Sequence, residues 1–261
     1  MASGITALVS GGSRGIGAAT VRRLAAADVH VIVAARNLVR ATGVVESILE
    51  QGGSAEALPL DVTDPASIDE LARRVGEVDW LVNNAGVADT APVLPREPGG
   101  NDGLFERLME VNLHGARRLV EAFAPGMVDR GRGVIVNVAS SAALKGYAYA
   151  AAYCASKHAL LGYTRTAALE LERKGVRVHA VCPHYVDTDL AAESVRRIVA
   201  KTGRSPEEAR AFLGEQNPGG RLIDADEVAG AVLVLLRSER TGLLAELDGS
   251  GPPDLRPLER E

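Results

Sequence analysis

Short apolar runs and single amphipathic helices alternate along most of the chain, and this alternation limits the possible folds more than any other feature. The apolar runs cover residues 5–10, 30–35, 57–60, 80–83, 134–138, 176–182 and 243–247. The helical patterns between them cover residues 18–27, 38–51, 65–74, 104–127, 155–174 and 225–237. Strands that are apolar on both faces and separated by one helix each form parallel sheets with right-handed crossovers. The sequence therefore predicts an α/β fold in a single domain, a doubly wound Rossmann sheet of about seven parallel strands flanked by helices.

The strand rhythm breaks between residues 184 and 220, where short charged helices are expected near 194–201 and 206–213. An excursion of this length in a compact domain is typical of a lid over a binding site. We therefore expect one domain over residues 1–249 that includes this lid. Residues 250–261 are rich in proline and charge, which favours a disordered tail.

The charge and cysteine content exclude several classes of partner. Lys and Arg together number 29 and Asp and Glu 34, for a net charge of −5, with neither sign gathered in a block. We therefore expect no nucleic-acid partner and no binding to an anionic membrane. Cys154 and Cys182 lack the spacing of a zinc site or a disulfide framework, which favours a cytoplasmic protein without a metal. The first apolar run is too short for a signal sequence or a membrane span.

A glycine-rich segment, SGGSRGIG at residues 10–17, lies where the first predicted strand passes into a helix. Glycines at such a junction permit a tight turn and let backbone N–H groups approach a pyrophosphate at the helix N-terminus. The spacing GxxxGxG differs from the GxGxxG dinucleotide pattern, and glycine-rich turns before helices are common. Alone, the segment is compatible with either a nucleotide site or an ordinary turn.

The end of the second strand bears on the choice of cofactor. Usual dinucleotide sites carry an acidic residue there that accepts a hydrogen bond from the ribose 2′-hydroxyl. This chain has Ala35 and Arg36 instead, and Arg14 lies in the glycine-rich segment. Guanidinium groups suit a 2′-phosphate, so the sequence predicts NADP(H) in preference to NAD(H). The alternative is that both arginines are solvated surface residues.

Three polar residues suggest proton chemistry at the same end of the sheet. Tyr153 and Lys157 are four residues apart at the start of a predicted helix and share one face. An ammonium group near a phenol lowers its pKa toward the range that a general acid needs. An isolated pair of this kind is more often a chance match on a helix surface. Ser140 follows the strand at 134–138, however, and ligands bind at the carboxyl ends of parallel strands.

Together with these features, the chain contains Asp61-Val62, Asn83-Asn84-Ala85-Gly86, Asn112 in VNLHG, and Pro183 to Thr188 in CPHYVDT. In this combination, over nearly its whole length, the sequence resembles the short-chain dehydrogenase/reductase family, especially its 3-oxoacyl-carrier-protein reductases and polyketide ketoreductases. The resemblance implies four catalytic residues: Asn112, Ser140, Tyr153 and Lys157. Tyr153 would donate or accept the proton, and Ser140 would orient the substrate carbonyl. Lys157 would bind the nicotinamide ribose and bias Tyr153, and Asn112 would support a proton-relaying water.

The resemblance also implies a set of cofactor contacts. These are Gly11, Ser13, Arg14, Gly15, Ile16, Gly17, Arg36, Asp61, Val62, Asn84, Ala85, Gly86, Tyr153, Lys157, Pro183, Val186 and Thr188. One position departs from the family, because His184 follows Pro183 where a glycine is usual. We expect His184 to point to solvent, the alternative being contact with the substrate.

The expected function is hydride transfer between NADP(H) and a small-molecule carbonyl or secondary alcohol. An NAD-dependent hydroxyacyl or hydroxyacid dehydrogenase and a non-catalytic dinucleotide-binding regulator are the alternatives. Relatives that act on carrier-bound substrates contact the acidic carrier near the positions of four basic residues, Arg130, Arg132, Arg173 and Lys174. A carrier-bound substrate is therefore one alternative. The other is that these residues are solvated helix ends. The resemblance further implies a homo-oligomer, a tetramer or a dimer.

Overall fold

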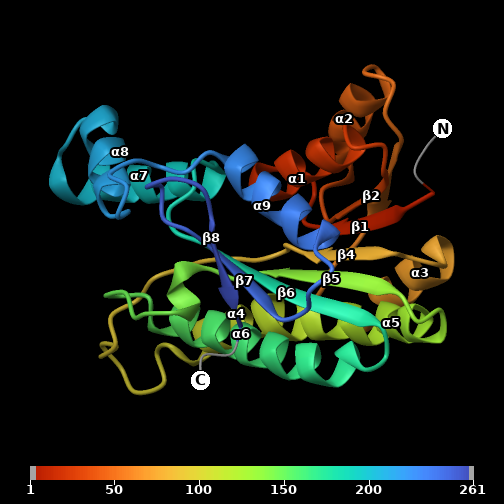
Figure 1. Ribbon diagram of the computed structural model, residues 1–261. Helices are drawn as coiled ribbons and strands as arrows, with labels where there is room; N and C mark the ends of the chain where they lie inside the picture. The colour runs from red at the N-terminus through yellow and green to blue at the C-terminus, as the bar shows by residue number, and fades with distance from the viewer. Residues whose placement is uncertain (1–3, 259–261) are drawn as a thin grey trace.

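The central element is an eight-stranded sheet in the order β3-β2-β1-β4-β5-β6-β7-β8 (Figure 1). The structure is a computed structural model that describes residues 4–258. In chain order the strands are β1 (Thr6–Ser10), β2 (His30–Ala35), β3 (Ala55–Pro59), β4 (Trp80–Asn83), β5 (Gly133–Val138), β6 (Val176–Pro183), β7 (Leu243–Leu247) and β8 (Asp254–Pro257). The seven predicted parallel strands are confirmed, and β8 adds an antiparallel edge strand.

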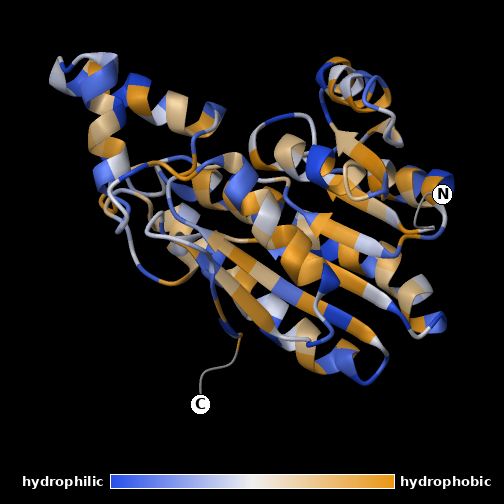
Figure 2. Cartoon of the chain, turned by 45° about the horizontal axis from the view of Figure 1, so that its top comes forward, coloured by the Kyte–Doolittle hydropathy of each residue, from blue (hydrophilic) through white to orange (hydrophobic). Residues whose placement is uncertain are grey.

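Helices cover both faces of the sheet, as the apolar strands require. The helices are α1 (Gly15–Ala25), α2 (Leu38–Leu49), α3 (Pro65–Val75), α4 (Asp102–Met109), α5 (Gly115–Asp129), α6 (Ala151–Glu172), α7 (Asp189–Thr202), α8 (Pro206–Glu215) and α9 (Ala225–Arg237). Figure 1 shows α1, α2 and α9 on one face and α3, α4, α5 and α6 on the other. Two buried clusters fill the spaces between helices and sheet, and Figure 2 shows the apolar residues concentrated on the strands. Within residues 4–258 no helix has both the length and the apolar character of a membrane span.

The order of the strands creates a binding edge. Strand β1 pairs with β2 on one side and with β4 on the other, so the chain winds away from β1 in two directions. At such a switch point the loops that follow neighbouring strands diverge and leave a crevice at their carboxyl ends. The loops after β1, β4, β5 and β6 therefore meet at one edge, which is where the sequence places its polar motifs.

The helix predicted over residues 104–127 is interrupted. Helix α4 ends at Met109, a π-helical segment runs over Glu110–His114, and α5 begins at Gly115. Asn112 lies in this segment, and its side chain hydrogen-bonds the backbone of Val87 and the Ser156 hydroxyl. Tertiary hydrogen bonds of this kind are invisible to helical periodicity, which explains why the pattern predicts one continuous helix.

The expected disordered tail from residue 250 onward differs from the structure. Asp254–Pro257 forms β8, which pairs with β7, and the Leu258 side chain is buried. Arg256 of β8 forms ion pairs with Glu246 and Asp254, and the Leu258 backbone N–H donates to the Gly242 carbonyl. Most of these contacts depend on the pairing of the tail with β7, which a proline-rich composition does not reveal. Residues 259–261 lie outside the described residues.

Helices α7 and α8 occupy the segment where a lid is expected, and both extend beyond the predicted ranges. Helix α8 begins with a capping box, in which Ser205 and Glu208 each bind the backbone N–H of the other. Figure 1 shows the two helices packed together, standing away from the sheet at one end of the molecule. They leave the main body beyond β6 and return through the segment that leads to α9.

Candidate active site

A cleft of about 1500 Å³ runs along the carboxyl ends of the strands. Its walls come from the loops after β1, β2, β4, β5 and β6, from the start of α6, and from α7 and α8. Every residue expected to contact a cofactor lines this cleft except Gly17. Of the four expected catalytic residues, Ser140, Tyr153 and Lys157 line it and Asn112 does not. Residues separated by more than 170 positions thus share one cavity.

The glycine-rich loop leaves no room for side chains at two positions. Gly11 has a φ of +68°, and a Cβ there would lie 2.9 Å from the Cα of Ala85. A Cβ on Gly17 would overlap the carbonyl oxygen of Gly11 and the amide of Asn84. Gly17 therefore shapes the loop by allowing α1 to pack closely, although it does not face the cleft. The Ser10 hydroxyl accepts hydrogen bonds from the backbone N–H groups of Asn84 and Ala85, 3.1 Å each, and so joins the ends of β1 and β4.

The far end of the cleft is rich in guanidinium groups. Arg14 and Arg36 are both exposed there, as the sequence predicts. Arg40, in the first turn of α2, also lines the cleft, and the sequence patterns do not single it out, although it lies only four residues after Arg36. The guanidinium groups of Arg14 and Arg40 lie 3.4 and 3.6 Å from the carboxylate of Asp189 on α7. An anionic group bound here would therefore meet three arginines and compete with Asp189.

Asp61 occupies the wall beside this arginine group. Its Oδ1 accepts hydrogen bonds from the backbone N–H of Thr63 at 2.9 Å and from the Thr63 hydroxyl at 2.7 Å. These bonds, helped by the positive charge of Arg36, lower the pKa of Asp61 below its ordinary value. The carboxylate is therefore ionised and held in one orientation at the cleft wall.

Lys157 lies in the first turns of α6, almost fully buried. Its ammonium group donates to the backbone carbonyl of Val138, the last residue of β5, over 3.0 Å and lies 6.0 Å from the centre of the Tyr153 ring. Burial lowers the pKa of Lys157 to about 8. The helical spacing of four residues thus does place the phenol and the ammonium group on one face, directed at the end of β5.

The pKa of Tyr153 differs from the expectation that a neighbouring ammonium group lowers it. Burial raises the pKa to about 12, and the nearby Ser140 hydroxyl offsets only part of this shift. Desolvation of the phenolate is the largest effect on this pKa, and the ammonium group of Lys157 donates to the Val138 carbonyl. Tyr153 is therefore a protonated phenol at neutral pH.

Asn112 lies behind the cleft wall. Its Nδ2 donates to the Val87 carbonyl and the Ser156 hydroxyl, and its Oδ1 accepts from the Val87 N–H, at 2.9 Å each. Gly86 separates it from the cleft: a Cβ there would lie 3.2 Å from Asn112 Oδ1 and 3.5 Å from Lys157 Nζ. The Asn112 side chain therefore joins the loop after β4 to α6 and borders the lysine without lining the cavity.

Tyrosines gather at the other end of the cleft. Four of the five tyrosines in the chain line it: Tyr147, Tyr149, Tyr153 and Tyr185. The rings of Tyr147 and Tyr185 meet edge to face with centroids 6.1 Å apart, and the Tyr147 hydroxyl hydrogen-bonds Ser141 at 2.7 Å. No local sequence pattern predicts this aromatic wall, because Tyr185 comes from the loop after β6 and Tyr147 from the loop after β5.

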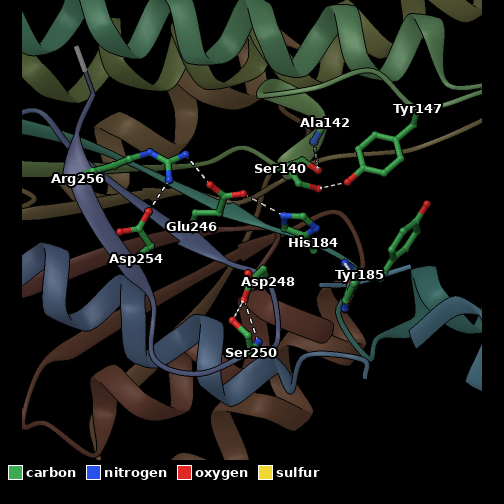
Figure 3. Close-up of polar contacts among 12 residues, drawn as sticks. Ser140, Ala142, Tyr147, His184, Tyr185, Glu246, Asp248, Ser250, Asp254 and Arg256 are labelled. Carbon is green, nitrogen blue, oxygen red and sulfur yellow. Dashed lines mark hydrogen bonds and ion pairs between the residues drawn. The ribbon is translucent and has the colours of Figure 1, made fainter. Parts of the chain in front are cut away.

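His184 does not point to solvent, which makes that expectation wrong. Its side chain is 2% exposed, and its Nε2 lies 3.0 Å from a carboxylate oxygen of Glu246 on β7 (Figure 3). The backbone N–H of His184 donates to the Leu247 carbonyl and continues the pairing of β6 with β7. The residue that departs from the family pattern is therefore held inside the protein, and it lines the cleft near the tyrosines.

Comparisons with known proteins agree with this geometry. Residues 5–198 match the sequence model of the family described as short chain dehydrogenase. The chain is 35% identical over 241 residues to galactitol 2-dehydrogenase of Agrobacterium fabrum, which covers 92% of this chain and 93% of that protein. It is 33% identical over 243 residues to the 3-oxoacyl-acyl-carrier-protein reductase FabG of Escherichia coli, covering 93% and 94%. A crystal structure of an actinorhodin polyketide ketoreductase variant with NADPH has a TM-score of 0.87 and 34% identity, covering 95% of this chain and 97% of that one.

Proposed function

The chain belongs to the short-chain dehydrogenase family and is therefore an oxidoreductase, and from that premise we propose that it interconverts a ketone and a secondary alcohol with NADP(H). The observation that carries this proposal is the meeting of Ser140, Tyr153 and Lys157 in one cleft with the glycine-rich loop. A phenol, a buried ammonium group and a hydroxyl are what a carbonyl oxygen needs when its carbon gains or loses a hydride.

The cleft fits a dinucleotide with a 2′-phosphate. The glycine-rich loop leads into the N-terminus of α1, where backbone N–H groups favour a pyrophosphate, and Cβ atoms at Gly11 and Gly17 would close the turn. Arg14, Arg36 and Arg40 supply charge for the 2′-phosphate at the far end. When bound, NADPH supplies the hydride that the carbonyl carbon accepts. Asp61, Val62 and the run from Asn84 to Gly86 would hold the adenosine side, with Pro183, Val186 and Thr188 beside the nicotinamide.

The protein's part in the reaction is to bind the substrate carbonyl and to move one proton. The Ser140 hydroxyl would orient the carbonyl oxygen, and the O–H of Tyr153 would donate its proton to that oxygen as the carbon gains the hydride. The phenolate that remains would be stabilised by Lys157, the nearest cation in the site. Reprotonation through Lys157, whose pKa burial lowers to about 8, returns the phenol to its starting state. Oxidation of an alcohol reverses each step.

Finer features of the function are also proposed. The aromatic wall of Tyr147 and Tyr185 supports a substrate with apolar surface, and a carrier-bound substrate is compatible with the open mouth beside α7 and α8. Arg130 and Arg132 do not line the cleft and pair with Glu77 and Asp79. Arg132 is 72% exposed, which favours its interpretation as a solvated end, whereas Arg130 is only 17% exposed and donates to the Val78 carbonyl, so it is not a solvated end. Membership of the family supports a homo-oligomer, a tetramer or a dimer. Two free, buried cysteines support a cytoplasmic location.

The experiment that tests the function is NADPH oxidation with a panel of ketones, compared between the wild type and two tyrosine variants. Tyr153→Phe removes the proposed proton donor, and we expect turnover to fall at least ~100-fold while NADPH still binds. Tyr163→Phe is the matched control, because Tyr163 lies on the same helix and does not line the cleft. Turnover that survives in Tyr153→Phe, or equal loss in both variants, would reject Tyr153 as the acid.

A further inference from the structure

A line of polar side chains reaches the cleft from the C-terminal edge of the sheet. It begins at Asp254 and Arg256 of β8, passes through Glu246 of β7, and ends at His184 after β6 (Figure 3). One carboxylate oxygen of Glu246 contacts Arg256 and the other lies 3.0 Å from Nε2 of His184. Side-chain exposure falls from 65% at Asp254 to 22% at Glu246 and 2% at His184, so the line runs from the surface into the protein.

Glu246 determines which ring nitrogen of His184 carries the proton. An ionised carboxylate only accepts hydrogen bonds, so the nitrogen that faces Glu246 must be N–H. Arg256 pairs with the other carboxylate oxygen of Glu246 and holds it in place. In the ring tautomer that satisfies Glu246, Nε2 is the donor and Nδ1 is an acceptor with a free lone pair.

This acceptor has no partner. Within residues 4–258, Nδ1 of His184 is buried and forms no hydrogen bond. Several polar groups drawn near the ring in Figure 3 have partners elsewhere. The Tyr147 hydroxyl pairs with Ser141, and the backbone N–H groups of Tyr185 and Ala142 donate to Asn217 and Ser140. A buried acceptor without a donor is costly, so an unpaired one in a cleft indicates a missing ligand group.

The position of the ring shows where that ligand would lie. His184 lines the cleft together with Ser140, Tyr147 and Tyr185. Figure 3 shows its ring between Glu246 on one side and Tyr185 on the other, on the same side of the sheet as Ser140. Ser140 is the residue proposed to orient the reacting carbonyl, so the unpaired nitrogen belongs to the substrate end of the cleft.

We propose that Nδ1 of His184 accepts a hydrogen bond from a hydroxyl group of the substrate, so that the enzyme prefers hydroxyketones, and the corresponding diols, over the same ketones without the hydroxyl. This inference rests on the proposed function and adds a substrate class to it. Glu246 acts as a positioning residue, because it fixes the ring and its tautomer, and Arg256 holds Glu246. A hydroxyl donates where a carbonyl, ether or carboxylate cannot, so the site selects by donor ability and not by polarity alone.

The test compares paired substrates in the full-length enzyme with NADPH. The pairs are hydroxyacetone with acetone, and each ring-hydroxylated cyclohexanone with cyclohexanone. For each pair the ratio of kcat/KM values is measured in the wild type, His184→Leu and His184→Asn. Leucine and asparagine have nearly the same shape, but only asparagine keeps a polar atom near the place of Nδ1. Calorimetry with the enzyme–NADP⁺ complex gives the affinity for each ketone independently of turnover.

For the best hydroxyketone we expect the ratio to fall ~10-fold or more in His184→Leu and by less than ~3-fold in His184→Asn. An unchanged ratio in His184→Leu overturns the proposal and leaves a bound water as the partner of Nδ1. Equal loss in both variants also overturns it, because shape would then be the cause. Binding that depends on the hydroxyl and on His184, without reduction of any ketone, would support the site and refute the proposed function.

A measurement on the wild type keeps the proposal testable if the variants do not fold. Nitrogen-15 NMR should show Nδ1 of His184 without a proton in the free enzyme, with a chemical shift that moves on adding a hydroxyketone and not its parent ketone. A protonated Nδ1, or a shift that responds equally to both ketones, overturns the proposal.

Discussion

Replacing Lys157 by methionine should stabilise the protein at neutral pH while removing a residue of the proposed active site. Lys157 is almost fully buried, and its ammonium group donates a hydrogen bond to the Val138 carbonyl over 3.0 Å. Methionine has a similar length and no charge, so it fills the same space without desolvating a cation. The proposed active site thus carries a cost in stability that this substitution measures.

The pKa of Lys157 sets the size of this cost. It falls from the ordinary value of 10.5 to about 8, so the charged form is destabilised by ~3 kcal/mol in the folded protein. Loss of the hydrogen bond to Val138 returns ~1 kcal/mol. At pH 7 we therefore expect Lys157→Met to raise the free energy of unfolding by ~2 kcal/mol.

The gain should shrink as the pH rises. Between the folded pKa of about 8 and the unfolded value of 10.5, the unfolded chain holds more protons at this residue than the folded one. Stability of the wild type consequently increases with pH in this window, whereas Lys157→Met has no such contribution. At pH 9.5 the penalty in the wild type is ~1 kcal/mol, so the advantage of the variant should fall by ~2 kcal/mol.

Urea unfolding at pH 7 and pH 9.5, at matched protein concentration, measures both differences. Lys174→Met is the control, because Lys174 is exposed after the end of α6 and should give a small, pH-independent change. The desolvation argument would be refuted if Lys157→Met were less stable than the wild type at pH 7. It would also be refuted if the difference in free energy of unfolding between the two proteins were the same at both pH values.

Two further substitutions test the cofactor end of the cleft. Arg36→Asp should lower NADPH affinity ~10–100-fold with little effect on NADH affinity. Arg22→Asp is the control, because Arg22 lies on the exposed face of α1 and its loss should leave the ratio of the two affinities unchanged. Fluorescence titration measures both affinities, and a constant ratio in Arg36→Asp would reject the role of Arg36. Gly17→Ala should weaken NADPH binding at least ~10-fold and lower Tm, because the new Cβ overlaps the Gly11 carbonyl. Gly43→Ala on α2 is the control, because the Cβ there meets open space and should stabilise the protein by up to ~1 kcal/mol. Unchanged NADPH binding in Gly17→Ala would contradict the close packing.

Several parts of the site follow from local sequence because their geometry is local. The glycines of residues 10–17 predict a strand-to-helix turn, and the spacing of Tyr153 and Lys157 places both side chains on one helical face. Arg40 lies only four residues after Arg36, near the start of the predicted helix at 38–51, but its contact with Asp189 joins α2 to α7. That contact depends on how the lid packs, and no short-range pattern records it.

The pairing of His184 with Glu246 shows where local reasoning ends. The two residues lie 62 positions apart, and the register of β6 with β7 decides that they meet. The same register, extended by β8, delivers Arg256 to Glu246 and orders a tail whose composition predicts disorder. Strand register comes from the packing of the whole sheet, so these contacts are not readable from either segment alone.

The amino-acid sequence by itself determined the parallel sheet, the edge at which the site forms and most of the residues along the cleft, because apolar periodicity, glycine geometry and helical spacing act over a few residues. Only the tertiary structure decided the raised pKa of Tyr153, the contact between His184 and Glu246 and the partners of the last strand. Burial and charge at one atom depend on groups brought from distant parts of the chain, and the folded packing alone brings them together.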